Sequence, residues 1–287
     1  MTDRPDSVMG LVELARRSFG QAGLANPAAD ARLLVGGLLR LSHGQIVAGH
    51  DAAVAAGDAQ RVRAAIERRL RHEPVHRILG HRSFHDLDLR LSPATLEPRP
   101  DTEILVDHIL PYLKTIIANK GNAQVLDLGT GTGAIALSLL KQCPEAVATG
   151  TDIAPEALVT AQQNAHLNGL SDRFSTVQSH WFVEIDGRFD IIVSNPPYIR
   201  TDVIKALAPD VRDFDPPAAL DGGPDGLDAY RAIAAGAKDH LDDDGLVALE
   251  IGFDQKTDVA KIFQACGFSL LEAARDYGGN DRVLLFR

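Results

Sequence analysis

The chain has little of what several common protein classes require. Among its 287 residues there are only two cysteines, Cys143 and Cys266, which lie far apart without zinc-site spacing, so we expect a reducing compartment rather than a disulfide scaffold. No segment approaches the roughly 18 apolar residues of a membrane span. The first ten residues lack the apolar stretch of a secretory signal. These absences predict a cytoplasmic protein with no membrane partner.

An excess of positive charge is also missing. Lysine and arginine number 29 against 39 aspartates and glutamates, which gives a net charge of −10. Proteins that bind nucleic acid mainly through phosphate contacts usually carry a basic excess, so we expect no direct nucleic-acid binding. One basic string can form either a nucleic-acid face or a solvated helix face, and the acidic balance favours the second: Arg61, Arg63, Arg68, Arg69 and Arg71.

The apolar pattern divides the chain into three parts. Residues 1–80 repeat apolar side chains at helical spacing and predict a small helical N-terminal domain. Residues 81–95 alternate apolar and polar side chains, which predicts a β-hairpin linker. Four histidines occur between positions 72 and 85, but Pro74 and Gly80 interrupt the helix that would align them, so we predict no metal site. Residues 96–287 form the third part.

This third part alternates between strand and helix patterns. Such an alternation predicts an α/β domain with a mostly parallel sheet that is covered on both faces. The last two apolar runs are joined by too few residues for a crossover helix, so they should pair antiparallel. We expect strands near 125–128, 146–151, 174–178, 189–194, 245–250, 269–274 and 282–286, and helices near 101–113, 134–140, 155–168, 227–240 and 256–266.

A glycine-rich loop follows the first of these strands. Glycines permit a tight strand-to-helix turn and a close approach of a ligand to the backbone. The loop fits either a dinucleotide or S-adenosylmethionine, and Asp152, at the end of the next strand, can hold ribose hydroxyls in both cases. Asp127, in the strand just before the loop, suits the ammonium of S-adenosylmethionine better than a pyrophosphate. The loop consists of Gly129, Thr130, Gly131, Thr132 and Gly133.

A second motif, Asn195-Pro196-Pro197-Tyr198, follows the strand at 189–194. Its two prolines stiffen the loop and prevent the strand from continuing. The Asn195 oxygen and the Pro196 carbonyl can accept both hydrogens of a planar NH2 group, and the Tyr198 ring can stack on its face. The motif therefore predicts a site that binds a planar NH2 group. Together with the glycine loop, it resembles class I S-adenosylmethionine methyltransferases that alkylate an amide or an exocyclic amine, which implies a catalytic role for Asn195, Pro196 and Tyr198.

In combination, the motifs resemble the HemK/PrmC family of protein-(glutamine-N5) methyltransferases. Besides the glycine loop and Asn-Pro-Pro-Tyr, four segments carry the resemblance: Pro74-Val-His-Arg-Ile-Leu-Gly80, Pro98-Arg-Pro-Asp-Thr-Glu103, Ser179-His-Trp-Phe182 and Ala219-Leu-Asp-Gly-Gly-Pro-Asp-Gly226. The resemblance covers nearly the whole chain. It implies a class I, Rossmann-like methyltransferase with a helical N-terminal substrate-binding domain. The implied reaction is methylation, by S-adenosylmethionine, of the Gly-Gly-Gln glutamine of class-1 peptide chain release factors.

The resemblance also assigns residues to sites. It places the glycine loop from Gly129 to Gly133, Asp152, Trp181 and Asn195 around the cofactor. It places Asn195, Pro196, Pro197 and Tyr198 around the substrate glutamine. Two positions depart from the family pattern: His180 stands where the family usually has aspartate, and Glu97 where it usually has an aliphatic residue.

Three other functions compete with this interpretation. Adenine-N6 nucleic-acid methyltransferases share Asn-Pro-Pro-Tyr, but the acidic charge and the lack of a basic recognition domain weigh against one. A nicotinamide oxidoreductase would leave Asn-Pro-Pro-Tyr without a purpose. A non-enzymatic binding module would leave both motifs without one. The sequence therefore favours the glutamine methyltransferase.

Overall fold

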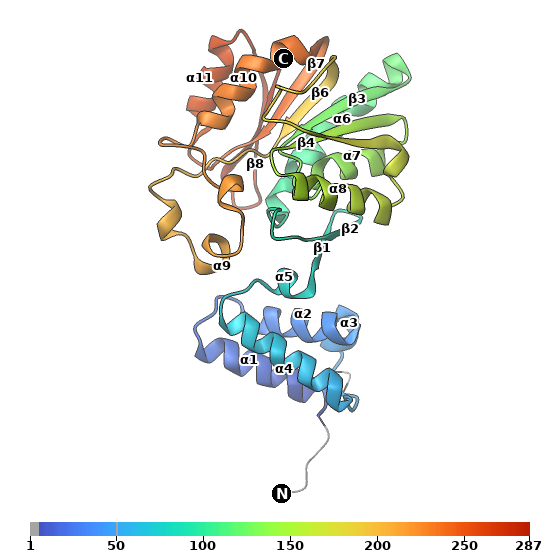
Figure 1. Ribbon diagram of the computed structural model, residues 1–287, viewed down its shortest axis with the longest axis vertical. Helices are drawn as coiled ribbons and strands as arrows, with labels where there is room; N and C mark the ends of the chain where they lie inside the picture. Colours follow the sequence, from blue (N-terminus) through green and yellow to red (C-terminus); the bar gives the residue numbers. More distant parts are fainter. Residues whose placement is uncertain (1–5, 50) are drawn as a thin grey trace, which may run out of the picture. The chain divides into compact units, whose positions relative to one another are not determined.

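The computed structural model describes residues 6–49 and 51–287, and the chain divides into two compact units at His81/Arg82. The first unit is drawn in colours from blue to cyan and the second in colours from teal to red (Figure 1). Within the described residues, no helix is both long enough and apolar enough to cross a membrane.

The first unit is helical, as the sequence predicts. Three longer helices, α1, α2 and α4, pack around a core that includes Phe19 and Leu34. Two short helices were not predicted because each spans barely one turn; α3 is stabilised by a capping box in which Ser42 and Gln45 bond each other's backbone N–H groups. The helices are α1 Val8–Gln21, α2 Pro27–Leu39, α3 His43–Val47, α4 Ala56–Leu70 and α5 Val75–Leu79.

The basic string on α4 is largely paired with carboxylates. Arg61, Arg63 and Arg68 form ion pairs with Asp58, Asp6 and Glu73. Arg69 does not belong to a solvated face, as its side chain is only 7% exposed and donates to Asp30 at 2.8 Å. The positive charges of these four arginines are therefore balanced by carboxylates of the first unit.

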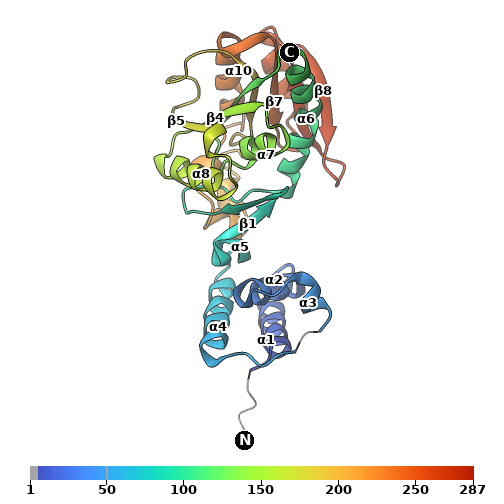
Figure 2. The ribbon, with the colours of Figure 1, turned by 90° about the vertical axis from the view of Figure 1, so that its right-hand side faces the viewer.

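The second unit has three layers, with helices on both faces of a seven-stranded sheet (Figures 1 and 2). Its strands are β3 Ala123–Leu128, β4 Ala146–Asp152, β5 Phe174–Gln178, β6 Phe189–Ser194, β7 Leu241–Glu250, β8 Leu270–Arg275 and β9 Asp281–Phe286. Its α-helices are α6 Pro100–Lys120, α7 Ala134–Gln142, α8 Pro155–Leu167, α9 Pro209–Arg212, α10 Asp228–His240 and α11 Lys256–Ala265. Three short 3-10 helices lie at Ser171–Arg173, Ile204–Ala206 and Pro217–Ala219.

The sheet has the order β5-β4-β3-β6-β7-β9-β8, and all its strands run in one direction except β9, which is antiparallel to both β7 and β8. Alternate residues of each inner strand enter different cores. Val125 and Ile191 face a core built with α6, α7 and α8, while Leu126 and Ile192 face a core built with α10 and α11. Both sides of the sheet are thus buried, which confirms the predicted doubly covered sheet with its antiparallel hairpin.

Two elements differ from the sequence-based expectation. The helix expected to end near Leu113 continues through Pro111 as α6 to Lys120, because Ile116 and Ile117 pack against the core and keep the extra turns in place. The hairpin expected as a linker, β1 His81–Phe84 and β2 Leu87–Arg90, contributes Phe84, Leu87 and Leu89 to the same core. Residues 82–95 therefore pack as part of the second unit.

Candidate active site

The pairing of β3 with β6 brings the two main motifs together. The strands are parallel, and Leu128 lies opposite Ser194. The Ser194 hydroxyl donates to the Leu128 carbonyl at 2.7 Å, which locks the two strand ends. The glycine loop and Asn-Pro-Pro-Tyr each begin at the next residue. They therefore share the carboxyl edge of the sheet, at the point where the strand order reverses, which is where open α/β sheets bind ligands.

The glycine loop is bonded to a buried carboxylate of the preceding strand, Asp127. Gly129, Gly131 and Gly133 all have φ between 55° and 82°, in the left-handed region that favours glycine. Asp127 is 1% exposed, and its Oδ2 accepts from the Thr130 hydroxyl at 2.7 Å. Burial raises the pKa of Asp127 to about 6. Its other oxygen, Oδ1, is buried without a hydrogen-bond partner among the described residues.

Asp152 is a second carboxylate that is bonded to the glycine loop. It ends β4, and its two oxygens accept from the backbone N–H groups of Gly131 at 3.0 Å and Ala154 at 2.9 Å. Burial raises the pKa of the Asp152 carboxyl. Each carboxylate oxygen has further lone pairs, so Asp152 can still accept from a ligand's hydroxyl groups.

The Asn195 amide is oriented by a hydroxyl from α6. Asn195 Nδ2 donates to Thr102 Oγ1 at 3.2 Å. Thr102 in turn donates to Glu250 Oε2 at 2.6 Å, at the end of β7. The sequence alone gives no sign that these three residues meet, because they lie on three different elements.

A second glycine-rich segment, residues 221–226, packs on the backbone of the Asn-Pro-Pro-Tyr loop. A Cβ at Gly222 would lie 2.8 Å from the Pro197 carbonyl oxygen and 2.9 Å from Tyr198 Cα, so only glycine allows this approach. Gln255 Nε2 ties the two segments by donating to the carbonyls of Tyr198 and Gly226, both at 3.0 Å.

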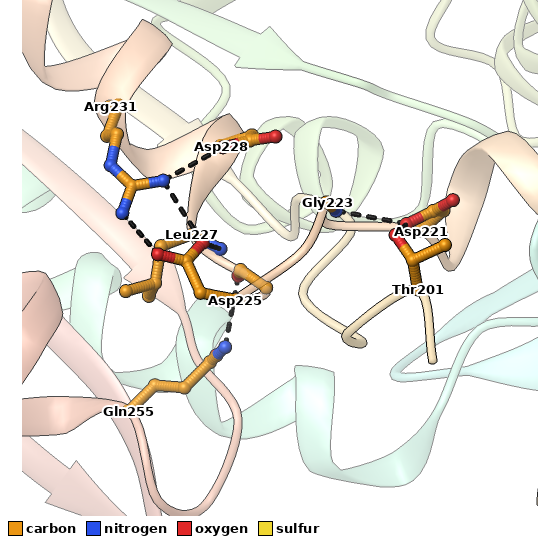
Figure 3. Close-up of polar contacts among 9 residues, drawn as sticks. Thr201, Asp221, Gly223, Asp225, Leu227, Asp228, Arg231 and Gln255 are labelled. Atoms are coloured by element: carbon orange, nitrogen blue, oxygen red, sulfur yellow. Dashed lines mark hydrogen bonds and ion pairs between the residues drawn. The ribbon is translucent and has the colours of Figure 1, made fainter. Parts of the chain in front are cut away.

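Side chains around this segment fix its shape (Figure 3). Asp221 accepts from the Thr201 hydroxyl at 2.7 Å and from the Gly223 N–H at 3.0 Å. Arg231 forms ion pairs with both Asp225 and Asp228. The segment is therefore a rigid clamp on the loop that carries Asn195.

These elements enclose a cavity of about 540 Å³. Ile153 and Trp181 form apolar walls, and Trp181 has an unusual positive φ of 55° that Ser179 stabilises by donating to its carbonyl at 2.9 Å. Such backbone outliers cluster at functional sites. Of the residues that the sequence singles out, the cavity is lined by Gly129, Thr130, Gly131, Thr132, Asp152, Trp181, Asn195 and Pro197.

Four expected site residues do not line the cavity: Asp127, Gly133, Pro196 and Tyr198. Asp127 lies beneath the glycine loop, and Gly133 is the N-cap residue of α7. Pro196 is buried, and Tyr198 packs against the α10–α11 core, where burial raises its pKa to about 12. Their side chains support the loops rather than face the cavity.

The two departures from the family pattern have different surroundings. His180 is exposed and lines the cavity beside Trp181, with the two ring centroids 6.0 Å apart. Glu97 is 3% exposed and forms an ion pair with Arg82 of β1, so its charge is compensated within the second unit.

Several cavity residues were not predicted as site residues. Arg99 is one of them, and it donates to Asp215 at 2.6 Å, which connects the segment before α6 to the loop after Tyr198. Ile153 is another; the structure leaves its side chain exposed, and the available sequence signal was an apolar residue directly after Asp152. Further cavity-lining residues that were not predicted as site residues include Leu96, Pro98, Thr102, Ser179, Pro216, Ala218, Ala219, Asp221 and Asp228.

We predict that Asp152→Ala weakens the binding of S-adenosylmethionine roughly tenfold or more, since a charge-assisted hydrogen bond contributes about 1.5–3 kcal/mol. The same change also releases the Gly131 N–H. Calorimetric titration measures the effect, and circular dichroism checks that the protein stays folded. An unchanged affinity would remove Asp152 from the binding site.

We also predict that Gly222→Ala lowers turnover by about tenfold to a hundredfold, because the new Cβ displaces the Pro197–Tyr198 backbone and small misplacements of reacting groups are costly. Gly57→Ala is the matched control, because an added Cβ there meets no atom within 4 Å. Initial methylation rates measure both variants. Equal rates would show that the clamp does not position the loop.

Comparison with known proteins agrees with this geometry. Residues 11–80 match the family model of the PrmC N-terminal domain, and residues 102–209 match that of the methyltransferase small domain. A release factor glutamine methyltransferase from Agrobacterium fabrum is 58% identical over 273 residues, which cover 95% of this chain and 94% of the relative. Another from Rhodospirillum rubrum is 46% identical, over 93% of this chain and 80% of the relative.

Among solved structures, a methyltransferase from Pyrococcus furiosus superposes with a TM-score of 0.52 at 22% identity, over 71% of this chain and 90% of that one. That likeness supports the class I methyltransferase fold. The sequence relatives, the two family models and the cavity at the carboxyl edge of the sheet lead to one conclusion: the chain belongs to the release factor glutamine methyltransferase family and is an S-adenosylmethionine-dependent methyltransferase.

Proposed function

We propose that this enzyme methylates the side-chain nitrogen, N5, of the glutamine in the Gly-Gly-Gln motif of class-1 release factors, and that Asn195 holds the glutamine amide. One observation carries the proposal. Asn195 lines the cavity beside the glycine loop, and its Nδ2 is already bonded to Thr102, so its Oδ1 is the atom left to accept from a substrate. Because release factors act in translation, we infer that the enzyme is located in the cytoplasm.

The described residues fit the cofactor. Gly129 and Gly131 offer bare backbone to the cavity, Asp152 offers a carboxylate, and Ile153 and Trp181 offer apolar surface. This combination suits a nucleoside with ribose hydroxyls and a flat base. S-adenosylmethionine supplies the methyl group as an electrophile on a positively charged sulfur.

The task of the chain's own residues is to present a poor nucleophile. An amide nitrogen has its lone pair delocalised into the carbonyl. An acceptor on each of its hydrogens favours a return of electron density to nitrogen and fixes the nitrogen in place. Asn195 Oδ1 is the first acceptor. We assign the second to the Pro196 carbonyl, which shares a peptide bond with the cavity-lining Pro197.

A second feature of the chain serves the protein substrate. The helical first unit has its own core and matches the PrmC N-terminal domain, whereas every residue that lines the cavity lies in the second unit. We therefore assign the first unit to gripping the release factor outside the reacting glutamine.

We expect Asn195→Ala to lower the rate of methyl transfer by about 10²–10³, by analogy with the loss of one hydrogen bond made in a transition state. Cofactor affinity should fall much less. Asn195→Asp should also be severely impaired, because the Thr102 hydroxyl has one hydrogen and would face two carboxylates. Single-turnover transfer to release factor, followed by mass spectrometry, measures all variants.

The control for these variants is Asn122→Ala, at an exposed position before β3, which should keep normal activity. Turnover of Asn195→Ala within threefold of the unmodified enzyme would disprove the proposal that Asn195 holds the substrate amide.

We further predict that a chain beginning at Arg82 still binds S-adenosylmethionine, since it keeps the whole cavity and the Arg82–Glu97 pair. It should methylate intact release factor at least about tenfold less efficiently, because one of two linked binding surfaces is gone. A short Gly-Gly-Gln peptide serves as the control substrate, and its methylation should be equal for both chains. Full efficiency on intact release factor would refute the role of the first unit.

A further inference from the structure

A chain of three polar side chains connects the cavity to a fully buried carboxylate. Asn195 and Thr102 line the cavity, whereas Glu250 is 1% exposed and lies behind them. Asn195 Nδ2 donates to Thr102 Oγ1 at 3.2 Å, and Thr102 Oγ1 donates to Glu250 Oε2 at 2.6 Å. The three residues come from the loop after β6, the first turn of α6 and the end of β7.

The charge of Glu250 determines the direction of both hydrogen bonds. An ionised carboxylate only accepts, so the single hydroxyl hydrogen of Thr102 must point toward Glu250. Thr102 Oγ1 can then only accept from Asn195, which requires the NH2 end of the amide. The Oδ1 of Asn195 is thereby turned to the cavity.

Protonation of Glu250 removes this constraint. A neutral carboxyl can donate to Thr102 Oγ1, and the Thr102 hydrogen is then available to Asn195 Oδ1. In that arrangement the NH2 end of Asn195 faces the cavity, where it would oppose the NH2 of a substrate amide. The same three side chains can thus hold Asn195 in a productive or an unproductive orientation.

We propose that Thr102 and Glu250 are positioning residues, which act through Asn195 by keeping its acceptor oxygen toward the substrate amide. Neither is a catalytic residue, since their role is to orient the group that contacts the substrate. The inference rests on the proposed function, in which Asn195 accepts from the glutamine amide.

The groups around Glu250 place its ionisation near neutral pH. Burial raises the pKa of Glu250 to about 7, and Asp101 raises it further. The Thr102 hydrogen bond, the Arg282 guanidinium and hydrogen bonding from the Asn195 amide oppose this rise. The Tyr230 hydroxyl donates to the Glu250 backbone carbonyl at 3.0 Å. The Tyr198 phenol is close enough for the charge of Glu250 to raise its pKa. The productive orientation is therefore favoured above about pH 7 and is lost as the pH falls below it.

The first experiment compares two substitutions of Thr102 in the full-length enzyme. Thr102→Val keeps the shape but removes the hydroxyl, and we expect kcat to fall by about tenfold or more, with cofactor affinity within threefold. Thr102→Ser restores the hydroxyl and should recover most of kcat. Equal kcat in Thr102→Val and the unmodified enzyme would overturn the proposal, as would equal impairment of both variants.

The second experiment observes Asn195 directly, without substrate or cofactor. The two hydrogens on Asn195 Nδ2, followed by NMR in protein labelled with ¹⁵N-asparagine and assigned with Asn195→Ala, should titrate with a midpoint near pH 7. Glu250→Gln should abolish that titration and flatten the low-pH fall of kcat. Resonances that do not titrate, or that titrate equally in Glu250→Gln, would overturn the proposal.

These two readouts separate the inference from the proposed function. If the unmodified enzyme fails to methylate release factor while the Asn195 titration is present and depends on Glu250, the substrate assignment fails and the orienting role stands. If methylation is normal and the titration is absent, the orienting role fails and the function stands.

Discussion

The parallel pairing of β3 with β6 is the constraint on which the site depends. It brings the glycine loop and Asn-Pro-Pro-Tyr, sixty-six positions apart from Leu128 to Ser194, to one edge of the sheet. Burial of both sheet faces fixes the register, because a shift by one residue would turn every apolar side chain of the strand toward the wrong core. The register of β3 against β6 therefore determines how close the glycine loop lies to the Asn-Pro-Pro-Tyr loop.

Two buried carboxylates near strand ends support the site loops in the same way, each by accepting a hydrogen bond from a threonine hydroxyl. Asp127 on β3 holds the glycine loop through Thr130, and Glu250 on β7 holds Asn195 through Thr102. Burial raises the pKa of both, to about 6 and about 7, so each is kept in place at an energetic cost. A polar group fixed before substrate arrives needs no reorganisation during the reaction. The site is thus built from loops whose supports lie in the rigid sheet.

The loop after Tyr198 supplies the remaining rigidity. Gly222 approaches the Pro197–Tyr198 backbone closely, and Gln255 bonds both segments. The sequence motif around Gly222 indicated family membership, yet its physical role appears only in the close approach of Gly222 to the Pro197–Tyr198 backbone. Arg99 and Asp215 join the same loop to the segment before α6.

Patterns along the chain were sufficient to predict the α/β alternation, the helical first unit, the antiparallel last pair of strands and the two loops that line the cavity. These features are local or periodic: apolar spacing, glycines that need positive φ, and prolines that end a strand. Other features depend on contacts between residues far apart in the chain, and these are set by tertiary packing. It extended α6 past Pro111, placed the β1–β2 hairpin on the second core, and turned Asp127 and Tyr198 away from the cavity. It also brought Thr102 and Glu250 to Asn195, because a hydrogen bond between residues on three elements depends on how those elements pack, and no pattern along the chain records it.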